Sequence, residues 1–148
     1  MQIKSFLTPE RTRARVQATS KKRVLETIAE LLANGKEELD SDRVFEELVN
    51  RERLGSTGLG NGVAIPHCRI PKLDAITGVC MSLDEGVDFE SIDQRPVDMI
   101  FGIMVPEEAN DSHLEALSVI AERFQRSDYI EKLRSAGSDE GLYHLLTA

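Results

Sequence analysis

Hydrophobic residues recur at helical spacing in two segments near the start of the chain. Apolar side chains within residues 20 to 34 lie three or four positions apart, and Gly35 follows as a stop signal. Residues 41 to 52 repeat this spacing, with Val44 and Leu48 on the same face. The pattern predicts two consecutive amphipathic helices that pack on a sheet.

A glycine-rich stretch separates these helices from a block of apolar segments. Residues 54 to 62 contain four glycines, and this composition predicts a loop without regular structure. Residues 63 to 65 predict a short strand that ends at His67. Two longer strands are predicted over residues 76 to 83 and 97 to 105, and the second is apolar enough to be central in a sheet.

Helical periodicity returns in the last third of the chain. One helix is predicted to begin at residues 110 to 112, and two shorter helices over residues 127 to 136 and 138 to 146. Helices before and after a block of strands are typical of a layered α/β domain. We therefore expect residues 1 to 148 to form a single domain.

Composition and charge narrow the classes of function. The formal net charge of −8 disfavours a duplex-DNA binder, because such proteins neutralise phosphates with basic residues. The apolar stretches fall well short of the roughly 18 to 20 residues of a membrane-spanning helix, and a secretory signal is absent, so we expect a cytoplasmic protein. Residues 1 to 23 carry seven basic residues against one acidic residue. We interpret them as a solvated basic edge, with a transit peptide or nucleic-acid arm as the alternative.

The three histidines lie in different surroundings. His67 follows the glycine-rich loop, whose backbone N–H groups could bind an anion, and an imidazole held there can act as a nucleophile near neutral pH. His113 falls in the first turn of a predicted helix, where free N–H groups and the helix dipole favour an anion. His113 is therefore a candidate phosphate contact, whereas His144 is interpreted as a packing or surface residue.

Other chemistries fit the spacing less well. No Gly-Lys-Ser/Thr follows the loop, and its glycines do not form a G-x-G-x-x-G turn into a helix, which disfavours ATP and NAD binding. A metal site from His67, Cys68, His113 and His144, as in a metal-dependent hydrolase, lacks the usual paired ligand spacing. We expect Cys68 and Cys80 to be reduced thiols.

The segment from Arg51 to His67 reads Arg-Glu-Arg-Leu-Gly-Ser-Thr-Gly-Leu-Gly-Asn-Gly-Val-Ala-Ile-Pro-His. It resembles the active-site signature of the fructose/mannitol-type enzyme IIA domains of the bacterial phosphoenolpyruvate-dependent phosphotransferase system. Residues 111 to 118 resemble the second histidine motif of that family. The amino-acid sequence of the loop is more similar to that of the nitrogen-regulatory branch than to that of the sugar-transporting branch. Cys68 stands at a position where the family frequently has a glycine.

This resemblance implies a three-layer α/β domain, with a mixed β-sheet flanked by helices on both faces. It also implies a phosphohistidine at His67, in a pocket where His113 and Arg51 assist. Backbone donors for the phosphoryl group are then expected around Thr57, Asn61 and Gly62. The implied activity is that of a phosphoryl carrier, which needs no ATP, metal or other cofactor at this step.

The resemblance also implies partners. The phosphoryl donor would be an HPr-like phosphocarrier protein, and the targets would be regulated proteins such as transporters and sensor kinases, without nucleic-acid binding or membrane insertion. The chain has no residues left for a IIB domain, so we expect a stand-alone regulator. Two alternatives stay open: a sugar-specific IIA component that passes phosphate to a separate IIB, and a binding module that does not depend on phosphorylation.

Overall fold

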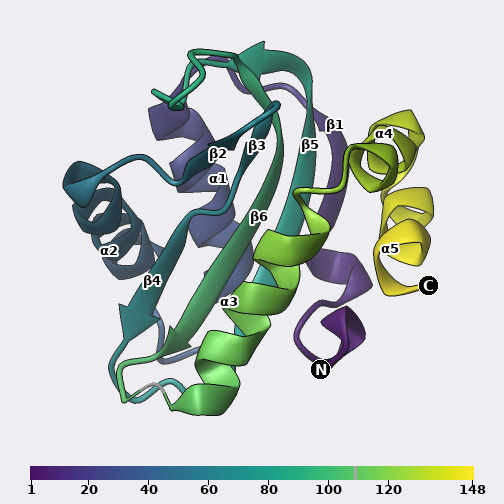
Figure 1. The fold of residues 1–148 in the computed structure, drawn as a ribbon. Helices are drawn as coiled ribbons and strands as arrows, with labels where there is room; N and C mark the ends of the chain where they lie inside the picture. The colour runs from purple at the N-terminus through teal and green to yellow at the C-terminus, as the bar shows by residue number, and fades with distance from the viewer. Residues whose placement is uncertain (109) are drawn as a thin grey trace.

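The structure is a computed structural model that describes residues 1 to 108 and 110 to 148. Within these residues a six-stranded mixed sheet lies between helices on both faces (Figure 1). The strands are β1 (Thr12–Val16), β2 (Gly58–Gly60), β3 (Val63–Ala64), β4 (His67–Ile70), β5 (Thr77–Val87) and β6 (Val97–Pro106). The predicted three-layer α/β fold is confirmed.

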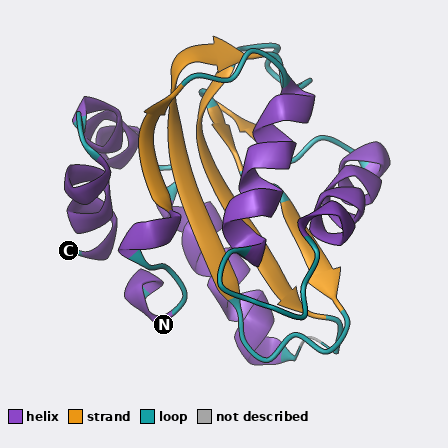
Figure 2. Cartoon of the chain, turned by 180° about the vertical axis from the view of Figure 1, so that it is seen from behind, coloured by secondary structure: helices purple, strands orange, loops and turns teal. Residues whose placement is uncertain are grey.

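Helices cover both faces of this sheet (Figures 1 and 2). The first face carries α1 (Lys21–Ala33) and α2 (Ser41–Leu54). The second face carries α3 (Asp111–Arg123), α4 (Ser127–Ser135) and α5 (Asp139–Thr147), together with the short 3₁₀ helix Ile3–Ser5. A second 3₁₀ helix, Pro9–Arg11, leads into β1. Each helix predicted from periodicity is confirmed, with small differences at the ends.

β6 is the strand on which the sheet is assembled. β5 pairs with one edge of β6 in antiparallel orientation, and β3 and β4 pair in parallel, one after the other, with its other edge. β1 extends the sheet beyond β5, and β2 extends it beyond β3. Residues 65 and 66 lie between β3 and β4 and belong to neither strand. Pairing with β6 resumes at His67, which lies opposite Ile103.

The side chains of β6 alternate between two hydrophobic cores, as the period of a strand requires. Ile100 and Met104 point toward α1 and α2, whereas Met99, Phe101 and Ile103 point toward the C-terminal helices. All five are completely buried. A continuous apolar run is therefore the correct signature of this central strand, as the sequence predicted.

The expectation of an irregular glycine-rich loop is wrong for its second half. β2 and β3 form an antiparallel hairpin, and Asn61 and Gly62 form the turn that joins them. Both turn residues have positive φ, 57° and 81°, a backbone conformation that Asn and Gly adopt at low cost. An Asn-Gly pair is a strong hairpin signal, which the count of glycines obscured.

Besides β2, two further strands were missed by the pattern analysis. β1 lies at the edge of the sheet and contains two arginines, so it lacks an apolar run. β4 has four residues and begins at His67, which was expected at the end of a strand. The basic segment at the start of the chain is thus partly an edge strand, where charged side chains discourage further strand pairing.

Gly102 in β6 allows α1 to pack closely on the sheet. A Cβ atom at this position would lie 2.7 Å from Ile28 Cγ2 and 2.8 Å from Val79 Cγ1, and both neighbours are stiff β-branched side chains. We predict that Gly102→Ala lowers the free energy of unfolding by about 1 to 3 kcal/mol, as overpacking does. Urea unfolding measures this, with Gly137→Ala as the control, since a Cβ at Gly137 meets nothing within 4 Å. Equal stabilities of the two variants would contradict the prediction.

Candidate active site

A cavity of about 420 Å³ lies between α2 and α3, beside the edge strand β4. It is lined by Glu47, Asn50, Arg51 and Leu54 of α2, His67, Cys68 and Arg69 of β4, Ile103 and Val105 of β6, and His113, Leu114 and Leu117 of α3. The structure therefore brings Arg51, His67 and His113, which are far apart in the sequence, to one cavity.

The His67 ring is held in one orientation by the backbone. Its Nδ1 atom lies 2.9 Å from the carbonyl oxygen of Ile65, and a carbonyl can only accept, so Nδ1 carries the hydrogen. Burial, the largest cause, lowers the pKa of His67 below its ordinary value, and the Arg51 charge lowers it further. The neutral ring at neutral pH then has a free electron pair on Nε2, so Nε2 is the ring nitrogen that could act as a nucleophile.

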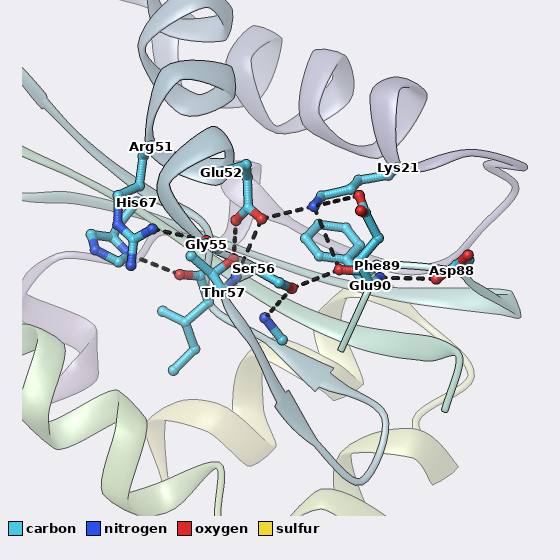
Figure 3. Close-up of polar contacts among 12 residues, drawn as sticks. Lys21, Arg51, Glu52, Gly55, Ser56, Thr57, His67, Asp88, Phe89 and Glu90 are labelled. Atoms are coloured by element: carbon cyan, nitrogen blue, oxygen red, sulfur yellow. Dashed lines mark hydrogen bonds and ion pairs between the residues drawn. The ribbon is translucent and has the colours of Figure 1, made fainter. Parts of the chain in front are cut away.

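Arg51 is fixed by the loop that follows its own helix. Its Nη1 donates to the carbonyl oxygen of Gly55 at 2.9 Å, just past the C-terminal end of α2. The guanidinium and the His67 ring lie near one another in Figure 3 and line the same cavity. A guanidinium placed there offers further N–H donors to an anion beside His67.

His113 is oriented by a reciprocal pair of hydrogen bonds at the start of α3. The backbone N–H of Asn110 donates to His113 Nδ1 at 3.0 Å, and the backbone N–H of His113 donates to Asn110 Oδ1 at 3.3 Å. This geometry is that of a capping box with histidine at the third helical position. Because Nδ1 accepts, the neutral ring carries its hydrogen on Nε2 and can donate from there.

Glu52, which the sequence analysis did not single out, is buried next to the cavity residue Arg51. Its carboxylate accepts from the backbone N–H of Thr57 at 3.2 Å, from the Thr57 hydroxyl, and from Lys21 Nζ at 2.9 Å (Figure 3). A signal for Glu52 was present, because it continues the buried face of α2 four residues after Leu48.

The structure places the loop residues expected to bind the phosphoryl group outside the lining of the His67 cavity. The N–H and hydroxyl of Thr57 are both used by Glu52, so neither is free for an anion. The N–H of Asn61 donates to Asp93 at 2.8 Å. Asn61 and Gly62 line a different cavity, beside Arg134, and not the cavity of His67. They serve as hairpin turn residues, since both occupy the positive-φ positions of that turn.

Arg69 is a further cation that the sequence analysis missed. It lies two residues after His67 on β4, so both side chains point to the same side of the strand. It lines the cavity, and its charge also lowers the pKa of His67. The alternation of side chains along a strand could have identified it, had β4 been predicted.

The remaining candidate residues do not form a second centre. Cys68 and Cys80 are buried free thiols, and burial raises the pKa of Cys68 to about 12. Among residues 1 to 108 and 110 to 148, no three His, Cys, Asp or Glu side chains are grouped to hold a metal ion. His144 is exposed on α5 and is not among the lining residues of the His67 cavity. None of the helices in this part of the chain is long and apolar enough to cross a membrane.

Comparison with known proteins agrees with this arrangement. Residues 5–148 match the model of the family described as "Phosphoenolpyruvate-dependent sugar phosphotransferase system, EIIA 2". The chain belongs to this EIIA 2 family. It is 46% identical to a nitrogen regulatory protein of Pseudomonas aeruginosa, over 99% of this chain and 95% of that one. It is 43% identical to the nitrogen regulatory protein of Escherichia coli, over 99% and 90% of the two chains.

Solved structures give the same assignment. The crystal structure of the nitrogen regulatory protein IIA-Ntr from Neisseria meningitidis superimposes with a TM-score of 0.90 at 39% identity, and covers 98% of this chain and 99% of that one. The IIA mannitol structure from Escherichia coli shares the fold, with a TM-score of 0.74 at 21% identity. Membership of the EIIA 2 family implies phosphoryl-carrier transferase activity, and the resemblance to the nitrogen-regulatory branch is confirmed.

The surroundings of His67 predict its titration. We expect ¹⁵N NMR of the ring to give a pKa below the ordinary 6.5, and Arg51→Met to raise that pKa, since Arg51 lowers it. With the folded pKa depressed, the unfolded state binds the proton first, so this group lowers the free energy of unfolding as pH falls below about 6.5. A wild-type pKa at or above 6.5 would contradict the described environment.

Proposed function

We propose that this protein is a cytoplasmic phosphocarrier and regulator. It accepts a phosphoryl group on Nε2 of His67 from an HPr-like phosphocarrier protein, and its phosphorylation state then controls binding to target proteins. The observation that carries this proposal is the hydrogen bond from His67 Nδ1 to the Ile65 carbonyl, which leaves Nε2 unprotonated beside two arginines.

The proposed transfer conserves bonds, electrons and protons without a cofactor. The electron pair on His67 Nε2 attacks the phosphorus of a phosphohistidine on the donor protein, and the N–P bond of the donor breaks as the new bond forms. The donor imidazole keeps the electron pair of the broken bond. His67 loses no proton, because Nδ1–H stays bonded to the Ile65 carbonyl.

Positive charge in the cavity stabilises the phosphoryl group during its transfer. Phosphoryl transfer asks a protein mainly to position the groups and to stabilise charge on the equatorial oxygens. Arg51 supplies a cation held by Gly55, Arg69 supplies a second cation on the same side as His67, and His113 supplies an N–H donor from Nε2. These three groups reach the cavity from α2, β4 and α3.

Exposed apolar side chains at the rim of the cavity suit a transient protein contact. Leu54 on α2 is 84% exposed and Leu114 on α3 is 51% exposed, and both line the cavity of His67. A donor or target that docks on these leucines would cover the imidazole. A phosphoryl group on His67 adds roughly −1.5 to −2 charges at the centre of that surface, by analogy with other phosphorylated side chains. Target binding can therefore depend on the phosphorylation state.

The regulatory role is favoured over a sugar-specific one by the pattern of similarity. Full-length relatives at 40 to 46% identity are named nitrogen regulatory proteins. A fructose-specific EIIABC component of Bacillus subtilis is 30% identical, and the match covers 23% of its length.

Incubation with phosphoenolpyruvate, an enzyme I-type kinase and an HPr-like carrier tests the proposal. We predict that intact-mass measurement finds one added phosphoryl group that acid removes, and that His67→Ala abolishes it. His113→Ala should retain the modification but slow its formation about 100-fold, as loss of one positioned donor does.

The matched control for both variants is His144→Ala, since His144 is exposed on α5 and does not line the cavity. It should accept the group at the wild-type rate. Retention of the phosphoryl group by His67→Ala would rule out His67 as the acceptor. An unchanged rate in His113→Ala would remove His113 from the site.

A further inference from the structure

Glu52 is a buried carboxylate whose oxygen atoms are both engaged. Only 5% of its side chain is exposed. One oxygen accepts from the Thr57 hydroxyl, and the other accepts from the Thr57 backbone N–H at 3.2 Å and from Lys21 Nζ at 2.9 Å. A charge this deeply buried is costly unless it is paired and hydrogen-bonded, and Lys21 and Thr57 supply these contacts.

Lys21 connects this carboxylate to two other parts of the fold. It lies at the start of α1, and its Nζ atom also contacts Glu90 at 3.4 Å and lies 4.9 Å from the centre of the Phe89 ring. Ser56 in the loop after α2 donates to the Phe89 carbonyl at 2.6 Å. The segment of residues 55 to 57 is therefore held from both sides, by Glu52 and by Phe89 (Figure 3).

Hydrogen bonds connect the segment of residues 55 to 57 to the side chains of Arg51 and His67. Its first residue, Gly55, accepts the Arg51 guanidinium at 2.9 Å. Its last residue, Thr57, accepts the backbone N–H of Ile65 at 3.1 Å, and the carbonyl of Ile65 accepts His67 Nδ1 at 2.9 Å. Displacement of this segment would move the cation and rotate the imidazole together.

We propose that Glu52, paired with Lys21, is a positioning residue for phosphoryl transfer to His67. Its carboxylate fixes the 55-to-57 segment, and this segment sets the place of Arg51 and keeps His67 in the form with the hydrogen on Nδ1. Glu52 touches neither the phosphoryl group nor the reacting nitrogen. The inference rests on the proposed function, and it extends that function to a residue outside the cavity.

The chemistry of the contacts requires a carboxylate. Three donors converge on Glu52, and an ionised carboxylate is the side chain that accepts from all of them. In Glu52→Gln one oxygen becomes an NH₂ group, which cannot accept a hydrogen bond, and the side chain loses the negative charge that pairs with Lys21. The substitution keeps the size of the side chain and breaks the pattern of donors and acceptors.

The experiment measures transfer rate and ring state in the same full-length variants. In Glu52→Gln we expect the phosphoryl-transfer rate at saturating donor to fall about tenfold to hundredfold, as displacement of reacting groups by about 1 Å can cause. The donor concentration for half-maximal rate should not change, because Glu52 is buried away from the docking surface. ¹⁵N NMR of the neutral His67 ring should show a smaller share of the Nδ1–H form.

Glu90→Gln is the matched control, because Glu90 binds the same lysine but is 77% exposed and does not touch the 55-to-57 segment in any described contact. It should keep the wild-type rate and ring state. Thr57→Val gives a milder test if Glu52→Gln does not fold, since it removes one of the three donors and keeps the ion pair. We expect its rate and Nδ1–H share to fall between those of the wild type and of Glu52→Gln.

The two readouts separate failure of this inference from failure of the proposed function. A wild-type protein that accepts no phosphoryl group refutes the carrier function, yet the ring state of His67 still tests the positioning role. If folded Glu52→Gln or Thr57→Val keeps the wild-type Nδ1–H share, Glu52 does not position His67 and the proposal is overturned. A changed ring state with an unchanged transfer rate overturns it equally.

Discussion

The hydrogen bond from His67 Nδ1 to the carbonyl of Ile65, 2.9 Å long, is the contact on which the proposed chemistry depends. It determines which ring nitrogen carries the hydrogen, and so which nitrogen can attack. Its geometry depends in turn on the break between β3 and β4 along one edge of β6. The Pro66 carbonyl accepts the N–H of Ile103 at 3.0 Å, which anchors that break to the central strand.

The cavity of His67 has basic side chains although the protein as a whole is acidic. The chain carries a net charge of −8, yet two arginines line the cavity of His67 and lower the pKa of its imidazole. The buried carboxylate of Glu52 acts in the opposite direction and raises the pKa of His67, but it is paired with Lys21 and does not line the cavity. Burial and the two arginines favour the neutral imidazole, and the arginines place positive charge where an anion would bind.

Local patterns in the sequence predicted the elements that are locally determined. Helical periodicity gave the helices, and apolar runs gave β5 and β6, because these elements are buried by one continuous face or on both faces. β1 was not predicted, because this edge strand contains two arginines and has no apolar run. His67 and His113 were indicated by their surroundings in the sequence, and the resemblance to the enzyme IIA family added Arg51. The Glu52–Lys21 pair joins α2 to α1, and no local pattern encodes such a contact.

The position of phosphorus on the ring tests the central claim most directly. The protein would be labelled with ¹⁵N at histidine and phosphorylated by its donor, and ¹H, ¹⁵N and ³¹P NMR would identify the modified nitrogen of His67. The account predicts phosphorus on Nε2, with Nδ1 still carrying its hydrogen toward Ile65. Phosphorus on Nδ1 would mean that this hydrogen bond breaks during transfer, and it would contradict the account.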